Sequence, residues 1–273
     1  YSDVEFPMPE IGSWAEEKNG NKTGSLEILK NPTLGNFPEE EICASRQSYY
    51  AAISFVDEQI GRVIEALGKR GELDNTIILF TADHGDMMGD HYMWRKCKPY
   101  EGSANVPMII RWPESLKINA KRGQIREELV ELRDVLPTVL DAAALPKPKE
   151  MEGLSMLDIM REKEWRKLLD LEHSEIYEPG NAWTCITDGR YKYIYFTLTG
   201  EQQLFDLSND PHELTDLAED PNNFQVVSEW RSKMADHLSI RGERWVLNGE
   251  LTVQETSQKY SPNDYRYNGT IEE

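Results

Sequence analysis

An amphipathic segment followed, after a short turn, by a continuous apolar run constrains the fold of this chain more than any other feature. Over residues 46–67, apolar side chains such as Ile53, Val56 and Ile60 recur every three or four positions, a spacing that predicts a helix with one apolar face. Residues 76–82 read Thr-Ile-Ile-Leu-Phe-Thr-Ala, which is typical of a strand buried on both faces. Because a helix that returns into a buried strand is half of a crossover unit, we expect an α/β fold with a mostly parallel sheet flanked by helices.

The sequence pattern changes near residue 166. Downstream, short alternating segments are separated by turn residues such as Asp188-Gly189, which predicts a small antiparallel sheet with a covering helix. We therefore divide the chain into an α/β part, residues 1–165, and a C-terminal antiparallel subdomain with its tail, residues 166–273. Besides those named above, the expected strands are 106–110, 128–132, 171–177, 183–187, 191–197 and 203–207, and the expected helices are 13–18, 134–144 and 224–240.

Charge and composition exclude several classes of protein. The 273 residues carry 30 basic and 49 acidic side chains, a net charge of −19, and a chain so acidic is a poor general ligand for nucleic acid or anionic membranes. No apolar run is long enough to span a bilayer, and the first ten residues lack the features of a signal peptide. The three cysteines, Cys43, Cys97 and Cys185, match neither a disulfide framework nor a Cys-x-x-Cys metal motif.

A candidate metal site begins where the strand at 76–82 should end. Asp83 and His84 are adjacent there and Gly85 follows them, and the crevice at the carboxyl ends of strands is where open α/β sheets bind ligands. An oxygen and a nitrogen ligand could therefore turn toward one ion. An N-cap or Asx turn beside a surface histidine is the alternative explanation of the same three residues.

Basic residues gather just downstream of this pair in an otherwise acidic chain. Arg95, Lys96 and Lys98 lie within four positions of one another, and His91 precedes them. Cations beside a metal loop suit a substrate with a tetrahedral anion, whose charge must be stabilised as bonds break. A solvated basic loop is the alternative interpretation.

Further sequence blocks surround this cluster. They are Tyr49-Tyr50-Ala51, Val56-Asp57, Ile60-Gly61-Arg62, residues 83–91, Trp94-x-Lys96, Tyr100-Glu101-Gly102-Ser103, Val106-Pro107, residues 187–194, Leu204-Phe205-Asp206-Leu207 and Asp210-Pro211-x-Glu213. In this order and spacing, between residues 46 and 238, they resemble the later half of a type I, arylsulfatase-like sulfatase of the alkaline phosphatase superfamily. The resemblance implies an incomplete alkaline phosphatase-like α/β fold followed by the small antiparallel sheet.

The resemblance implies a role for each residue that matches a family motif. Asp83 and His84 match two ligands of a divalent metal ion. Calcium is the ion of most sulfatases, and manganese or another divalent ion is the alternative because imidazole is less usual around calcium. Lys96 matches a lysine that contacts the sulfate oxygens and stabilises charge in the transition state, which makes it both catalytic and substrate-binding.

Three further residues are candidates because of their positions. His91 lies close to Lys96 in sequence, and either a catalytic role or a structural role is compatible with that position. Arg95 is a candidate for substrate binding and specificity. His173 ends a short apolar strand that approaches the active-site cleft in similar enzymes, so it either contacts substrate or forms hydrogen bonds at the subdomain interface.

The nucleophile of this family is a formylglycine made from the Cys or Ser of a Cys/Ser-x-Pro/Ala-x-Arg motif, and no such motif occurs here. Cys43-Ala44-Ser45-Arg46 invites the comparison, but it lacks the proline, is one residue short and lies directly before the helix at 46–67. We therefore expect the chain to be the C-terminal part of a sulfatase that is inactive alone. The formylglycine and the other metal ligands would belong to a missing N-terminal portion.

The expected function is hydrolysis of sulfate esters. The expected substrate is a sulfated small molecule or saccharide, in the manner of bacterial enzymes, with no nucleic-acid or membrane partner. Oligomeric state and localisation are undetermined, although family members are often periplasmic, secreted or lysosomal. Two alternatives stay open: a phosphodiesterase or phosphonate monoester hydrolase of the same superfamily, and a catalytically silent member that binds glycans.

Overall fold

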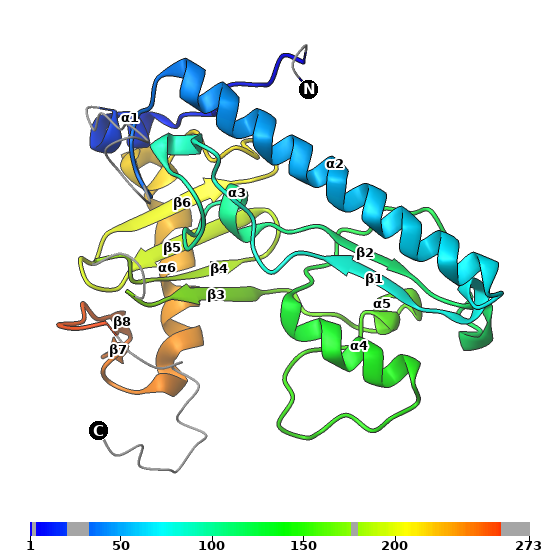
Figure 1. The fold of residues 1–273 in the computed structure, drawn as a ribbon. Coiled ribbons are helices and arrows are strands. Elements are labelled where there is room, and N and C mark those ends of the chain that lie inside the picture. The colour runs from blue at the N-terminus through cyan, green and yellow to red at the C-terminus, as the bar shows by residue number, and fades with distance from the viewer. Residues whose placement is uncertain (2–3, 21–32, 176–179, 258–273) are drawn as a thin grey trace, which may run out of the picture.

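The helices and strands form two regions (Figure 1). The structure is a computed structural model, and it describes residues 1, 4–20, 33–175 and 180–257. The first, which we call the α2 region, contains helices α2 (Glu39–Lys69), α3 (Glu101–Ala104), α4 (Val135–Ala142) and α5 (Leu157–Met160) and strands β1 (Ile78–Thr81) and β2 (Met108–Arg111). The second, the β3–β6 region, contains helices α1 (Ser13–Asn19) and α6 (Phe224–Leu238), strands β3 (Leu169–His173), β4 (Trp183–Thr187), β5 (Tyr191–Phe196) and β6 (Gln202–Asp206), and the hairpin β7 (Val246–Leu247) and β8 (Glu250–Leu251).

Helix α2 confirms the expected amphipathic helix but begins at Glu39 rather than at residue 46. Pro38 precedes it, and Glu39, Glu40 and Glu41 occupy its first turn. Proline favours the start of a helix because its φ is already close to the helical value, and carboxylates there interact favourably with the helix dipole. The periodic apolar pattern therefore located the helix interior but missed its polar first turns.

Strands β1 and β2 pair antiparallel, with Thr81 opposite Met108 and Ile78 opposite Arg111. The expectation of parallel strands is therefore wrong for this pair. A parallel pair requires a crossover, usually a full helix, that carries the chain back to the starting end of the first strand. Here the connection leaves Thr81 and returns at Met108 on the same end of the sheet, and its only α-helix is the single turn α3.

Residues 128–132, expected as a strand, instead form a loop that enters a one-turn 3-10 helix, Leu132–Asp134, before α4. The carbonyl of Leu129 accepts a hydrogen bond from Trp165 Nε1 at 2.6 Å. Glu131 and Asp134 form a reciprocal capping box. Because side chains satisfy these backbone groups, the segment does not need a neighbouring strand.

Strands β3 to β6 form an antiparallel sheet in chain order, which confirms the expected C-terminal sheet. The Asp188-Gly189 turn joins β4 to β5: Asp188 Oδ1 accepts hydrogen bonds from the backbone N–H groups of Arg190 and Tyr191, and Gly189 has a φ of 90°. Of the strand expected at 171–177, residues 176–177 lie outside the described residues, and β3 ends at His173.

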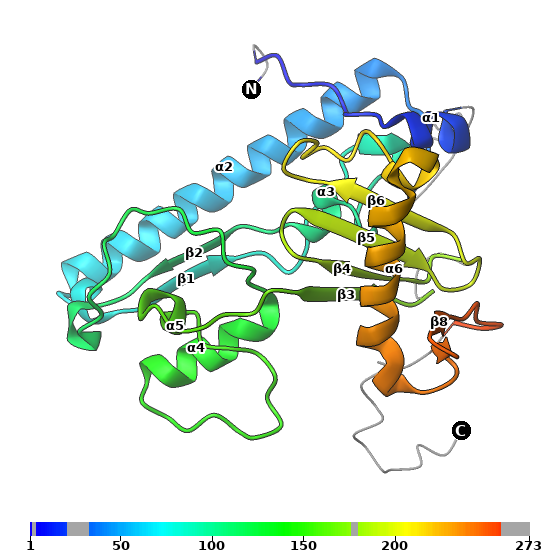
Figure 2. The same cartoon turned by 180° about the vertical axis from the view of Figure 1, so that it is seen from behind.

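Both faces of the β3–β6 sheet are covered. Figure 2 shows helix α6 lying across one of them. Strand side chains alternate between the faces. One face buries Ile186, Tyr193 and Leu204 against Trp230 of α6. The opposite face packs against α1 and the loop after β1, and its cluster contains Trp14, Met87, Met93, Tyr100, Cys185, Ile194 and Phe205. The sheet is therefore packed directly against the loop that holds the candidate site, while the expected boundary after residue 165 stays a prediction.

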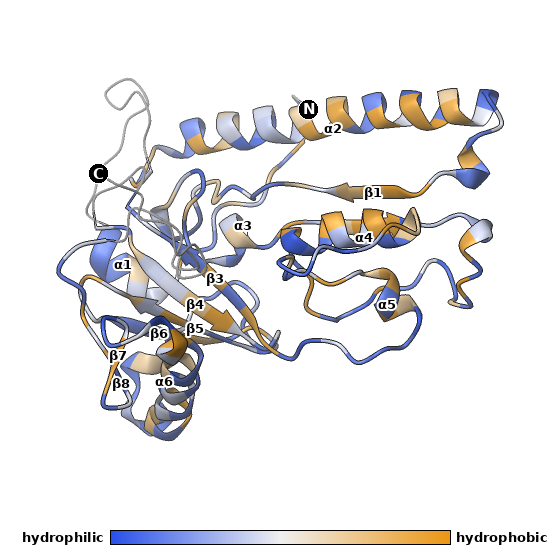
Figure 3. Cartoon of the chain, turned by 90° about the horizontal axis from the view of Figure 1, so that it is seen from below, coloured by the Kyte–Doolittle hydropathy of each residue, from blue (hydrophilic) through white to orange (hydrophobic). Residues whose placement is uncertain are grey.

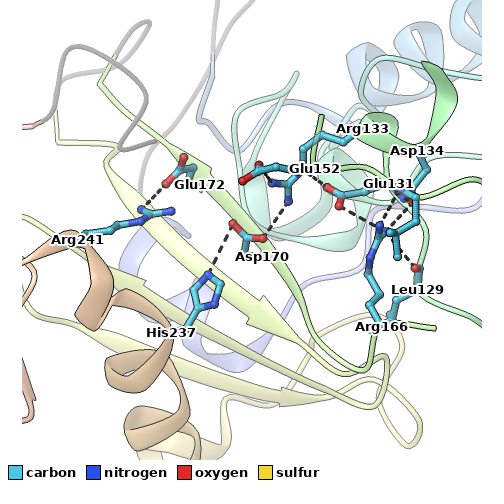
Figure 4. Close-up of polar contacts among 11 residues, drawn as sticks. Leu129, Glu131, Arg133, Asp134, Glu152, Arg166, Asp170, Glu172, His237 and Arg241 are labelled. Carbon is cyan, nitrogen blue, oxygen red and sulfur yellow. Dashed lines mark hydrogen bonds and ion pairs between the residues drawn. The ribbon is translucent and has the colours of Figure 1, made fainter. Parts of the chain in front are cut away.

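Charged side chains join the two regions beside β3 (Figure 4). Arg166 places its two terminal nitrogens 2.6 Å from the two carboxylate oxygens of Asp134, which is fully buried. Arg133 donates to Asp170 of β3 at 2.9 Å, and His237 of α6 lies 3.7 Å from the same carboxylate. A planar guanidinium that binds a carboxylate through two nitrogens fixes orientation as well as distance, so this cluster sets how α4 meets β3.

Helix α2 and the β1–β2 pair expose much of their apolar surface, and Figure 3 shows apolar residues along α2, β1 and α4. Phe80 is 37% exposed and Ile109 60%. The expectation that residues 76–82 form a strand buried on both faces is thus wrong, because β1 and β2 pair only with each other among the described residues. Within the same residues, no helix combines the length and apolar character needed to cross a membrane.

Candidate functional site

The loop after β1 turns Asp83 and His84 toward a common point. His84 Nδ1 lies 2.7 Å from the carbonyl oxygen of Gly85, and because a carbonyl only accepts, this contact places the proton on Nδ1. The lone pair is thereby left on Nε2, and Asp83 Oδ2 lies 3.5 Å from that atom. A carboxylate oxygen and an unprotonated imidazole nitrogen therefore face the same space, and their role as metal ligands stays a prediction.

Lys96 joins this pair from the following loop. Its Nζ lies 2.9 Å from His84 Nε2, so the ammonium group donates to the free lone pair of the imidazole. The three side chains that the sequence assigned to one site, Asp83, His84 and Lys96, thus converge in the structure. The arrangement offers one carboxylate oxygen and one ammonium group to a ligand that enters from solvent, and a metal ion bound to His84 Nε2 would replace the hydrogen bond from Lys96.

Close backbone packing holds the start of this loop in place. The N–H of Gly85 donates to the carbonyl of Ser103 at 2.8 Å. A Cβ at residue 85 would lie 2.2 Å from the carbonyl oxygen of Gly102. Only glycine therefore fits at this position without moving α3, and α3 in turn fixes the backbone directly after His84.

Asp86 fixes the loop that carries Lys96. Its Oδ1 accepts hydrogen bonds from the backbone N–H groups of Met88 at 2.9 Å and Arg95 at 3.0 Å. The carbonyl of Arg95 accepts from the N–H of Met87 at 2.8 Å. Arg95, the residue before Lys96, is thus held at both its N–H and its carbonyl by residues that follow the Asp83-His84 pair. No local sequence pattern indicates this role for Asp86.

His91 does not join the cluster in the structure, and its contacts fit the structural alternative better than the catalytic one. The residue is 2% exposed, its Nδ1 accepts from the N–H of Gly12 at 3.1 Å, and its ring packs against Trp14 and Tyr100. Burial disfavours the charged ring and lowers the pKa of His91 to about 4. The imidazole therefore stays neutral at neutral pH and serves as a core hydrogen-bonding group.

Arg95 and His173, the other two candidate residues, have different surroundings. The Arg95 side chain is exposed, which keeps it available for substrate. His173 is half-buried: its Nδ1 donates to the carbonyl of Asn181 at 2.8 Å and its ring stacks on Trp183 at 6.0 Å between centroids. Asn181 and Trp183 both contact the carbonyl of Cys97. These contacts favour the interface role for His173, and contact with substrate stays a prediction.

Cys43 and Arg46, the residues that imitate a nucleophile motif, lie inside α2. Arg46 is 8% exposed and donates to Asp90 Oδ1 at 2.8 Å, to the carbonyl of Pro7 at 2.8 Å and to that of Met88 at 3.1 Å. It therefore anchors the helix to the loop that leads to Lys96. Cys43 lies one helical turn before this anchor, a position that suits a structural residue of α2.

The donor set at the cluster fits part of a divalent-cation site. The Asp83 side chain is 85% exposed and His84 presents Nε2 on the same side, and a carboxylate oxygen with an imidazole nitrogen is a usual pair of ligands for a divalent ion. Among the residues that the structure describes, no three His, Cys, Asp or Glu side chains come together to complete a site. Asp83 and His84 could therefore supply two ligands, and a complete shell needs donors from elsewhere.

Two protein-family models match this chain. The C-terminal family model of N-sulphoglucosamine sulphohydrolase matches residues 89–239, and the sulfatase family model matches residues 12–145. The chain belongs to the sulfatase family of the alkaline phosphatase superfamily. The two matches overlap across the loop that carries His91, Arg95 and Lys96.

Individual relatives agree with this assignment. An arylsulfatase of Clostridium perfringens is 38% identical over 254 residues, which cover 92% of this chain and 51% of that protein. The phosphonate monoester hydrolase of Silicibacter pomeroyi superimposes with a TM-score of 0.72 at 27% identity, over 88% of this chain and 51% of that one. A structure solved with its substrate D-glucosamine-2-N,6-O-disulfate superimposes with a TM-score of 0.62 at 27% identity, over 81% of this chain and 45% of that one. The chain thus spans about half the length of these relatives.

Proposed function

We propose that this protein hydrolyses sulfate esters, and that the chain supplies Lys96 as the cation that binds the sulfate. The observation that carries the proposal is the convergence of Asp83 Oδ2, His84 Nε2 and Lys96 Nζ directly after β1. As sulfur–oxygen bond cleavage leaves charge on the ester oxygens, an ammonium fixed beside them stabilises the transition state more than the ground state. Membership of the sulfatase family supports this chemistry.

Asp83 and His84 would hold a divalent metal ion, which in sulfatases serves to polarise the sulfate. Calcium fits the hard carboxylate of Asp83, whereas the imidazole of His84 also suits manganese. We propose calcium as the ion, with manganese as the alternative. Removing metal with a chelator and restoring activity with each ion separately distinguishes the two.

The proposed substrate is a sulfated saccharide or another small sulfate ester. The substrate named in the glucosamine-disulfate complex supports a saccharide, and the exposed Arg95 beside Lys96 suits a second anionic group on it. The net charge of −19 disfavours long polyanionic glycans. Rates on sulfated mono- and disaccharides, compared with an aryl sulfate, test this choice.

The decisive experiment measures hydrolysis of an aryl sulfate by the full-length gene product, beside the same protein with Lys96→Ala. Loss of one charge-stabilising donor lowers kcat by roughly a hundredfold or more, and we expect that loss here. Lys69→Ala is the matched control, because Lys69 is exposed on α2 and forms an ion pair with the exposed Glu65. An unchanged rate in Lys96→Ala would contradict the proposal.

The likeness to a phosphonate monoester hydrolase makes phosphoryl transfer the second candidate function. A phosphonate monoester and a phosphodiester are therefore assayed beside the aryl sulfate, and faster hydrolysis of either would replace the sulfatase proposal. The 273-residue chain is assayed separately. We expect no turnover from it, because its described residues bring together only two candidate metal ligands, and turnover would show that two ligands suffice.

A further inference from the structure

The carbonyl oxygen of Cys97 accepts two hydrogen bonds from the β3–β6 region. Asn181 Nδ2 lies 2.8 Å from it and Trp183 Nε1 lies 3.1 Å from it. A carbonyl oxygen has two lone pairs, so these two donors satisfy it completely. Asn181 is 9% exposed and Trp183 5%, which leaves little access for water to replace either donor.

Cys97 follows Lys96 directly, in a stretch of backbone that needs such support. Arg95 has a φ of 67° and Cys97 a φ of 70°, so both neighbours of Lys96 adopt the left-handed conformation that residues other than glycine populate sparsely. A conformation of this kind persists only when surrounding contacts hold it. Asp86 and Met87 hold the upstream neighbour, and the Cys97 carbonyl is held by the β3–β6 region.

We propose that Asn181 and Trp183 are positioning residues that aim the Lys96 ammonium group at the Asp83-His84 pair through the carbonyl of Cys97. The proposal rests on the sulfatase function proposed above, because Lys96 acts on sulfate only in that reaction. His173 contacts both positioning residues: it donates to the carbonyl of Asn181 and stacks on Trp183. The C-terminal sheet thereby takes part in catalysis without touching the substrate.

The first test compares two tryptophan variants in the full-length protein. Trp183→Phe keeps an aromatic ring against His173 but removes the N–H that reaches Cys97, and we expect kcat to fall roughly tenfold with a smaller change in KM, since small displacements of a catalytic group reduce the rate strongly. Trp165→Phe is the matched control: it removes an indole hydrogen bond of the same type, to the carbonyl of Leu129 at 2.6 Å, away from Lys96. Equal kcat values in the two variants would overturn the proposal.

The second test asks whether the effect passes through Lys96. In a Lys96→Ala background, Trp183→Phe should change kcat by less than about twofold, because residues that act through one another are not additive. A tenfold loss in that background would show that Trp183 acts by another route and would overturn the proposal. Asn181→Asp, which replaces the donor nitrogen by an oxygen of similar shape, is expected to mimic Trp183→Phe.

A third measurement is independent of sulfatase activity. Cys97 is partly exposed and is not in a disulfide, so the labelling rate of its thiol by a maleimide, read by peptide mass spectrometry, reports how often this loop opens. We expect Trp183→Phe to raise the Cys97 rate severalfold and Trp165→Phe to leave it unchanged, with Cys43 on α2 as the internal reference. Unchanged labelling would reject the positioning role even in an active enzyme. Raised labelling in a protein without turnover would reject the sulfatase function alone.

Discussion

The α2 region and the β3–β6 region both carry large apolar side chains at regular spacing, yet they bury them to different degrees. In the β3–β6 region, Trp230 of α6 is 1% exposed and Tyr193 of β5 is fully buried. In the α2 region, Phe55 of α2 is 64% exposed and Ile109 of β2 60%. Sequence periodicity therefore identifies the apolar face of an element but does not show what covers it.

The largest expected effect comes from truncating the best-covered helix residue. Trp230→Ala should lower the free energy of unfolding by about 3–5 kcal/mol, because it leaves a cavity under α6. Phe55→Ala, an aromatic truncation in the interior of an exposed helix, should change it by about 0.5 kcal/mol or less. Urea unfolding followed by circular dichroism measures both, and similar losses would mean that the exposed face of α2 is covered in solution.

A buried ion cluster joins the two regions, whereas most other ion pairs lie at the surface. Lys192 of β5 is 2% exposed and Glu213 1%. Lys192 Nζ donates to Glu213 Oε1 at 2.8 Å and also to the carboxylate of Glu101 on α3. Burial disfavours the ammonium group, but the two carboxylates outweigh it and raise the pKa of Lys192. The cation therefore remains charged and holds α3, which in turn supports the loop after His84.

Lys192→Met should lower the free energy of unfolding by about 3 kcal/mol, because the buried carboxylate of Glu213 loses its partner. Lys18→Met is the matched control: Lys18 of α1 pairs with Glu201 at 3.1 Å, but both side chains are at least half exposed. Exposed pairs contribute about 0–1 kcal/mol. Equal denaturant midpoints for the two variants would show that burial does not distinguish these ion pairs.

Local sequence patterns predicted helices, strands and short-range geometry well. They failed where contacts between distant segments determine the structure. The pairing of Asp83 with His84 and the hairpin at Asp188-Gly189 follow from neighbouring residues, and both are present. The antiparallel pairing of β1 with β2 depends on the path of the intervening loop. The contact of Trp183 with the Cys97 carbonyl joins residues that are 86 positions apart, and no local signal in the sequence marks it.

The smallest expected change in the free energy of unfolding concerns His91. This residue lies where both regions meet, since its ring packs on Trp14 and Tyr100. Its pKa is lowered by burial from 6.5 to about 4, with Asp210, His212 and Lys192 as the other groups that act on it. Between these two values the unfolded chain binds a proton that the folded chain does not. Stability should therefore be fully present above pH 6.5, fall by about 2–3 kcal/mol as the pH drops toward 4, and level off below. Urea midpoints across this range, compared with His91→Asn, measure the effect: the variant should lose the slope, and an identical slope in both proteins would show that His91 is not the group that titrates.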